Sequence, residues 1–439
     1  MLGPLFVYCL LGIVCIVAFF KPAIGVIGFY GFVLLDPGWN WRWSLEQGTP
    51  YQKYIFVCLA LAFALRGFRT QRFAKLAKFG VVALLFFLGL CFVSAQQSIA
   101  PAATEFFMSY AWKVVLVVVL AICVLDNPKH ITTLLIVAVL AQAYNAYQIN
   151  LEYFQLGISR YAQRPWGSMG VDNNGYSIIT VPVLAASFAL GLWEQMGWKK
   201  FLYLGISLLQ IHQIMLLESR GCMIAAVLLA MIAIWYMPRR DGNVRLIAAV
   251  AVMTVLLAGP SVVAEFSSSF ASKDERDSSA ESRFYLWQAG YRITMDYPVF
   301  GVGPNAARSL VPLPEYYDGG LDLNNKALHN LFFDVSTGMG IPAALIYFSF
   351  LLVPVVYCWR TYRRHDDRSD LGAARLAVVA GMPAYLLASM FSSGVLFESC
   401  YILAIVGYCT MNIDLANADS ESEDLDAEEN DDNVPDLVA

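Results

Sequence analysis

Two arginines and one histidine have the types and positions in this chain that suit chemistry. Arg220 lies at the apex of a hairpin between two apolar runs that have almost no loop between them. Arg283 begins a helical pattern within the polar stretch 265–328, and His329 follows that stretch directly. A charge at a membrane edge is costly unless it reaches water or an anion, and an imidazole accepts a proton from a hydroxyl near neutral pH. These residues therefore indicate anion binding and proton transfer at one membrane surface.

Each of the three residues also has a purely structural interpretation. Arg220 can extend to lipid headgroups or pair with Glu218. Arg283 can lie on a solvated helix and pair with Glu281, and His329 can simply precede a helix as its cap. The residues taken one by one leave both interpretations open.

The helical pattern at 283–292 places Arg283, Trp287 and Tyr291 on one face, at spacing i, i+4, i+8. That face suits a helix at the outer membrane interface, with its aromatic rings toward lipid or sugar. Asp172-Asn173-Asn174-Gly175 either binds sugar hydroxyls or caps the helix that follows it. The weaker candidates for substrate binding are Arg160, Arg164, Asn173, Asn174, Trp287 and Tyr291.

Several other kinds of chemistry lack their motifs. The expected outer loops contain no paired-carboxylate DxD motif and no histidine cluster, so we expect no metal site and no cofactor. No GxSxG or GxGxxG is present, and the turn-rich 298–305 segment resembles a phosphate loop only superficially. The nine cysteines lie in or at the ends of apolar runs without a CxxC pair, which is typical of small core residues.

The elements that must position these residues are membrane spans. The 439 residues are 58% hydrophobic and only 14% charged, whereas soluble domains have about 25% charged residues. We expect an all-α, polytopic transmembrane helical bundle of twelve or thirteen spans, with one large extracytoplasmic helical loop. The expected spans lie near 4–20, 22–35, 54–66, 79–95, 106–125, 131–150, 175–193, 201–218, 221–237, 246–264, 329–357, 375–394 and 396–413.

The distribution of Lys and Arg predicts the orientation of these spans. Basic residues recur in alternate connections from Lys21 to Arg375, and cytoplasmic loops are enriched in them. This alternation places the 265–328 loop, the 151–174 loop and the turn at Arg220 on the opposite, outer side. The functional candidates then share one membrane face.

The expected divisions of the chain follow from these spans. The N-terminal transmembrane helices occupy 1–264, the extracytoplasmic loop 265–328, and the C-terminal transmembrane helices 329–415. The remaining segment, 416–439, holds ten acidic residues and no basic one. The whole chain has a net charge of −5, and without this segment 29 basic residues stand against 24 acidic ones, a balance of +5. Such a run repels itself, so we expect a disordered cytoplasmic tail.

The order of motifs resembles the O-antigen ligase/polymerase superfamily. The residues that carry the resemblance are Ser219-Arg220-Gly221, the Arg283…Trp287 helix with Pro298-Val299-Phe300-Gly301-Val302-Gly303, and His329-Asn330 followed by Gly338-Met339-Gly340-Ile341. The opening, with Pro22, Gly25 and Asp36-Pro37, also resembles the exosortase-associated O-glycosylation ligase branch. The specific part covers about 219–341.

The resemblance implies an inverting, metal-independent glycosyltransferase of the bacterial inner membrane, with its active site toward the periplasm. Such proteins transfer a glycan from an undecaprenyl-diphosphate carrier to a hydroxyl of lipid A-core, in lipopolysaccharide biosynthesis, or of a protein. Arg220 and Arg283 correspond to arginines that contact the diphosphate, and His329 to the presumed base or acceptor-orienting group. The implied partners are donor, acceptor and membrane lipids, with no nucleic acid.

Two alternatives remain open at this point. A polymerase of the same superfamily joins two lipid-linked repeat units, and the sequence has no readable code for the acceptor. A transporter or flippase of lipid-linked glycan belongs to another class, and it predicts charges near the bilayer midplane with broken helices in paired halves. Here the candidate charges lie at the outer rim, which favours the enzyme.

Overall fold

The computed structural model describes residues 2–46, 48–66, 73–158, 172–259, 278–362 and 371–431, which contain helices and turns but no strand. Arg160 and Arg164 lie outside these described residues. The helices are α1 Leu2–Phe20, α2 Pro22–Leu35, α3 Pro37–Asn40, α4 Tyr51–Arg66, α5 Lys75–Gln96, α6 Pro101–Val124, α7 Pro128–Leu156, α9 Asn173–Trp193, α10 Gly197–Leu216, α11 Arg220–Tyr236, α12 Asp241–Leu257, α14 Ser278–Asp296, the short 3₁₀ helix η3 Ala307–Ser309, α15 Leu331–Met339, α16 Ile341–Thr361, α17 Gly372–Ser389 and α18 Glu398–Asp431.

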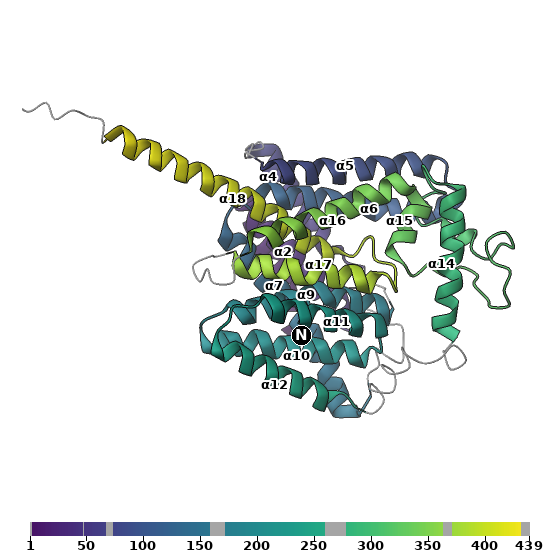
Figure 1. The fold of residues 1–439 in the computed structure, drawn as a ribbon, viewed down its shortest axis with the longest axis horizontal. Helices are drawn as coiled ribbons and strands as arrows, with labels where there is room; N and C mark the ends of the chain where they lie inside the picture. Colours follow the sequence, from purple (N-terminus) through teal and green to yellow (C-terminus); the bar gives the residue numbers. More distant parts are fainter. Residues whose placement is uncertain are drawn as a thin grey trace, which may run out of the picture.

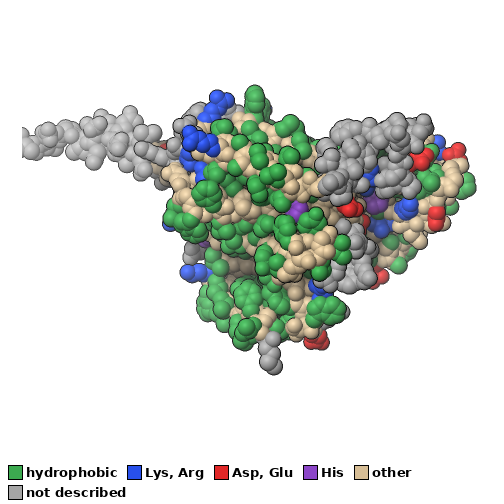
Figure 2. All heavy atoms as spheres, turned by 90° about the horizontal axis from the view of Figure 1, so that it is seen from below, with side chains coloured by type: hydrophobic (Ala, Val, Ile, Leu, Met, Phe, Trp, Pro, Cys, Tyr) green, Lys and Arg blue, Asp and Glu red, His purple; other side chains and the backbone are tan. Residues whose placement is uncertain are grey.

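The expected all-α membrane bundle is confirmed. Within the described residues, nine helices are long and apolar enough to cross a membrane, and three further apolar helices are shorter. The long helices run side by side, and α14 lies across one end of the bundle (Figure 1). The face seen in Figure 2 is largely apolar across its middle, with charged side chains gathered toward its ends. Such a belt is what a bilayer requires.

The centre of the bundle is α9. Every residue from Gly175 to Leu192 is buried, and α17 and α10 pack against it. Continuous burial explains why this helix is apolar on all sides, unlike the one-sided stripe of a surface helix. The helix begins at the predicted cap, because the Asp172 carboxylate accepts a hydrogen bond from the Gly175 N–H at 2.7 Å.

The expected span at 329–357 is wrong as a single helix. It is broken at Gly340, whose φ of 89° is left-handed, into α15 and α16. The nine residues of α15 rise only about 14 Å, which is too short to cross a bilayer. His329 therefore does not begin a span. It precedes a short helix that connects the polar loop to α16.

The segment 298–303, here called the strap, fixes that short helix. Its backbone joins the end of α15 through three hydrogen bonds, from Val302 N to Thr337 O at 2.8 Å, from Gly303 N to Gly338 O at 3.0 Å and from Ile341 N to Pro298 O at 2.8 Å. The strap also reaches the α5–α6 connection, where Ile99 N donates to Val302 O at 3.1 Å. Its glycines permit this close approach, because a Cβ on Gly301 would collide with the backbone of Thr337 and Gly338. The Pro-Val-Phe-Gly-Val-Gly motif is thus a backbone clamp.

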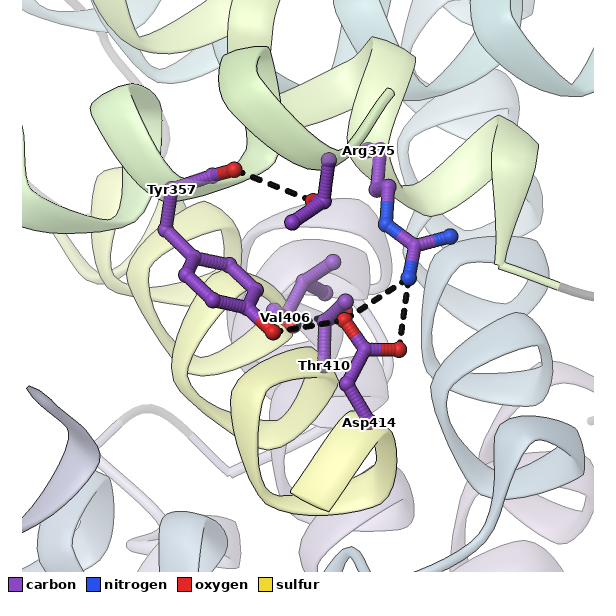
Figure 3. A network of polar contacts seen from close by, with 6 residues as sticks. Tyr357, Arg375, Val406, Thr410 and Asp414 are labelled. Atoms are coloured by element: carbon purple, nitrogen blue, oxygen red, sulfur yellow. Dashed lines mark hydrogen bonds and ion pairs between the residues drawn. The ribbon is translucent and has the colours of Figure 1, made fainter. Parts of the chain in front are cut away.

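Three helices meet in a polar contact near the other end of the bundle. One guanidinium nitrogen of Arg375 on α17 donates to both carboxylate oxygens of Asp414 on α18, at 2.6 and 2.8 Å (Figure 3). The hydroxyl of Tyr357 on α16 donates to the same carboxylate at 2.7 Å. Paired charges that are mutually hydrogen-bonded are tolerated within such a bundle, whereas single ones are not.

Helix α18 continues beyond this contact through Asp431, so it includes the first part of the acidic segment. Extending a helix that the bundle already holds avoids the cost of nucleation, which is the larger barrier to helix formation. The residues after Asp431 lie outside the described part of the chain.

The strap yields a stability prediction. Gly301→Ala should destabilise the protein by more than about 1 kcal/mol, because alanine is strained at a φ of 66° and meets the backbone of α15. Thermal unfolding in detergent and limited proteolysis of the polar loop measure this effect. Gly320→Ala is the matched control, since no atom lies within 4 Å of its added Cβ. Equal stability of the two variants would contradict the proposed clamp.

Candidate functional site

Arg220 is fixed by the turn between α10 and α11. The turn spans only Leu217 to Ser219, and Glu218 adopts a left-handed φ of 54°. The Asn173 side-chain amide donates to Leu217 O at 2.8 Å, which holds the turn against the start of α9. Arg220 is then the first residue of α11, and a helix N-terminus favours an anion. The predicted hairpin apex is confirmed.

Arg283 is oriented by the buried face of α14. Leu286, Ala289 and Ile293 on that helix are fully buried in a small core formed within the polar loop. This burial turns the neighbouring face toward the bundle, and Arg283 comes close enough to Cys222 in the first turn of α11 for its charge to act on that thiol. Arg283 thus lies beside the helix turn that begins with Arg220.

Phe391 joins the first two motifs. Its side chain lies against Gly221, where an added Cβ would approach the Phe391 Cβ to 2.9 Å. Its ring also contacts Trp287, with ring centroids 5.9 Å apart. The glycine after Arg220 therefore makes room for an aromatic contact that brings α14 onto α11.

His329 joins the same cluster through its backbone. The Trp287 indole N–H donates to His329 O at 3.4 Å, and His329 itself has a left-handed φ of 49°. Asn330 caps α15 by accepting a hydrogen bond from Phe332 N at 2.9 Å, and its amide donates to Met390 O at 3.4 Å. The backbone at His329 and Asn330 is thus held between α14 and the 390–397 loop.

Electrostatics keep this imidazole neutral. Burial lowers the pKa of His329 below its ordinary value of 6.5, and the nearby charge of Arg283 lowers it further. Arg308 and Lys326 act in the same direction, whereas the Asp172 carboxylate opposes them. Its Nδ1 atom is buried without a hydrogen-bond partner among the described residues. A neutral imidazole beside several cations can accept a proton at pH 7.

The remaining predicted residues divide into three groups. Trp287 belongs to the cluster, and Asn173 borders it, with its amide engaged by the Leu217 carbonyl. Asn174 is half-buried in the first turn of α9, and Tyr291 is 56% exposed. Arg160 and Arg164 lie outside the described residues.

The sequence did not point to Phe391 or Arg308. Residues 390–394 were assigned to a span at 375–394, but α17 ends at Ser389 and α18 begins at Glu398, so the assignment of that stretch was wrong. Ser392, Ser393 and Gly394 are the local signal for this loop, because such residues favour turns. Within the described residues, no group of three or more His, Cys, Asp and Glu side chains is arranged to hold a metal ion.

Comparison with known proteins gives one family match. Residues 205–348 match the family described as O-Antigen ligase. The matched segment contains Arg220, Arg283, the strap and His329, and it ends within α16. No curated protein matches the chain.

The electrostatics of His329 yield a titration prediction. The pKa of His329 should lie below 6.5, and Asp172→Asn should lower it further, because the opposing carboxylate is lost while the asparagine oxygen still caps α9. Imidazole NMR titration of the four histidines, assigned with His329→Gln, measures both values. Asp322→Asn is the control, because it removes an exposed carboxylate from the polar loop that precedes His329. An unchanged or raised pKa in Asp172→Asn would refute this arrangement.

Proposed function

We propose that the protein is a membrane glycosyltransferase that acts on a lipid-linked glycan, because residues 205–348 match the O-antigen ligase family. The donor is an undecaprenyl-diphosphate-linked glycan, and the acceptor is a hydroxyl of lipid A-core or of a protein. The protein lies in the bacterial inner membrane, and its active site faces the periplasm. The reaction inverts the donor linkage and requires no metal.

One observation supports this proposal most strongly. The three motifs of the matched segment come from α11, α14 and the residue before α15, and they meet around Phe391 and Trp287. The cluster combines a neutral histidine with nearby guanidiniums at one end of an apolar bundle. A lipid-linked diphosphate has its charged group at such a boundary and its apolar chain in the bilayer.

The proposed step is a displacement at the anomeric carbon. His329 takes the proton from the acceptor hydroxyl, the acceptor oxygen forms the new bond to the anomeric carbon, and the bond from that carbon to the diphosphate oxygen breaks. The bonding electrons leave with the diphosphate. Attack from the face opposite the leaving group converts an α-linked donor into a β-linked product. The energy comes from the donor linkage, so no ATP is needed.

Arg220 and Arg283 take the role of neutralising the leaving group. Charge develops on the diphosphate as its bond to the sugar breaks, and planar guanidiniums can bind two phosphate oxygens at once. Near a low-dielectric boundary, such contacts stabilise the transition state more than they would in water. The N-terminus of α11 adds its dipole in the same sense.

The ligase is preferred to the polymerase because of the single long loop and the resemblance of the N-terminal segment. Surface glycan profiling after deletion distinguishes them, because loss of a ligase leaves the acceptor without glycan whereas loss of a polymerase shortens the chains. A flippase is disfavoured because the candidate charges Arg220 and Arg283 lie near helix ends, whereas Arg375 and Asp414, within the bundle, are paired with each other. Purified enzyme would release free carrier diphosphate, and a flippase would only relocate the donor.

The proposed roles predict the effects of substitution. Arg220→Ala, Arg283→Ala and His329→Ala should each reduce transfer from purified lipid-diphosphate glycan by about a hundredfold or more, because each removes a group aimed at the transition state. The transfer rate should also remain low in Arg220→Lys and Arg283→Lys, since an ammonium group cannot bind two phosphate oxygens in the forked geometry of a guanidinium.

Matched controls test whether these losses are specific. Arg292→Ala removes an arginine of the same helix whose guanidinium donates to the Glu315 and Tyr316 carbonyls instead. His130→Ala removes a histidine that pairs with Asp126. Both should transfer at near wild-type rates, and full activity of all three site variants would overturn the assignment.

Chelation is a separate prediction. Because two guanidiniums take the role that a divalent ion has in other phosphoryl-linked transfers, EDTA should leave the transfer rate unchanged. The assay compares enzyme dialysed against EDTA with enzyme supplied with Mg²⁺ or Mn²⁺. A rate that falls with EDTA and returns with metal would exclude the metal-free mechanism.

A further inference from the structure

Arg308 lies on a rigid part of the polar loop. It is the central residue of η3, and the residues around it, Ala306, Ala307 and Val311, are buried in the core of that loop. The 3₁₀ helix in turn packs against α15, the helix that follows His329. The backbone under Arg308 is therefore fixed relative to the imidazole.

The charge of Arg308 reaches two groups of the site. It acts on the imidazole of His329 and on the carboxyl of Asp334 in the first turn of α15. Burial raises the pKa of Asp334 to about 6, and the charge of Arg308 opposes that rise. Because η3 also packs against α15, Arg308 belongs to the part of the loop that adjoins this helix.

The guanidinium of Arg308 is not committed to a protein partner. Arg308 is half-buried, and its side chain makes no hydrogen bond or ion pair with another residue among those described. Its five donors therefore need water or an anion. Asp334 attracts this guanidinium, but no ion pair within 4 Å joins them in the described part of the chain.

The charges around His329 are unbalanced. Three cations act on the imidazole, Arg283, Arg308 and Lys326, and the Asp172 carboxylate opposes them. The carboxyl of Asp334, with a pKa of about 6, adds a second negative group near Arg308, which leaves one positive charge in excess among these five groups. Cations gathered in a half-buried region repel one another, and a bound anion relieves that repulsion. The local excess of positive charge thus favours an anionic ligand beside the imidazole.

We propose that Arg308 is a third guanidinium of this site, which binds a phosphoryl oxygen next to His329. The identity of the phosphoryl group rests on the proposed function: it is either the diphosphate of the donor or a phosphate carried by the acceptor. The anion site itself rests on the arrangement of Arg308, Arg283 and His329.

Pyrophosphate binding to the purified full chain tests the anion site without any transfer reaction. Arg308→Gln should weaken the binding of inorganic pyrophosphate, measured by calorimetry, by about tenfold or more, because it removes a charge-assisted hydrogen bond. Arg308→Lys keeps the positive charge but lacks the planar, forked guanidinium. Its affinity for pyrophosphate should therefore lie between those of the wild type and Arg308→Gln. Arg292→Gln, which removes an arginine bound to loop carbonyls, should bind as wild type does. Wild-type affinity in Arg308→Gln would overturn the proposal.

The imidazole provides an independent readout that a merely structural role would not produce. Arg308→Gln should raise the pKa of His329 in the absence of ligand, since a cation that lowers it is lost. Pyrophosphate should raise the pKa of His329 in the wild type by adding negative charge beside it. Absence of both shifts would also overturn the proposal.

Transfer kinetics separate the two sources of phosphate. A raised KM for the lipid-diphosphate donor with an unchanged KM for the acceptor identifies the donor, and the reverse identifies the acceptor. If neither KM changes while wild-type transfer proceeds, Arg308 has no such role and the proposed function stands. If pyrophosphate binding depends on Arg308 but no lipid-diphosphate donor is ever consumed, the proposed function fails and the anion site stands.

Discussion

The site depends on the backbone contact between the strap and the junction of α15 with α16. A group at the end of an apolar bundle can be positioned only by elements that the bundle itself holds. The strap meets the end of α15 through backbone hydrogen bonds, and it meets the α5–α6 connection as well. Those bonds fix α15, and α15 fixes the backbone of His329 at its start. Glycine is required there because both backbones approach without space for a side chain.

Hydropathy was sufficient to predict the class of fold, since long apolar runs have few alternatives to membrane helices. It was insufficient to locate breaks within such runs. The largely apolar segment after His329 contains no run of polar residues long enough to signal a loop. It is nevertheless divided at Gly340, which has a left-handed φ. The 390–397 loop was missed although Ser392, Ser393 and Gly394 favour a turn there. Each break depends on packing against a segment far away in the sequence.

The residues of the site were predictable only in part. Arg220, Arg283 and His329 stand out by type, by position at the ends of apolar runs and by their order. Phe391, by contrast, is an ordinary aromatic residue in the sequence, and its contacts with Gly221 and Trp287 join segments more than a hundred residues apart. Arg308 similarly resembles any loop arginine. Its relation to His329 follows from the burial of η3 in the loop core, which no local pattern encodes.

The electrostatics around His329 connect its basicity to the proposed donor. In the free site, burial and the neighbouring cations depress the pKa of the imidazole, so it is neutral and ready to accept a proton. A diphosphate bound by the guanidiniums would cancel part of their charge and raise that pKa. The histidine would thus become a stronger base when the donor is in place, when removal of the acceptor proton is useful. Without an anion, the cations around His329 only make it a weaker base. Beside an anionic leaving group, the same cations bind that group, and the histidine regains its basicity.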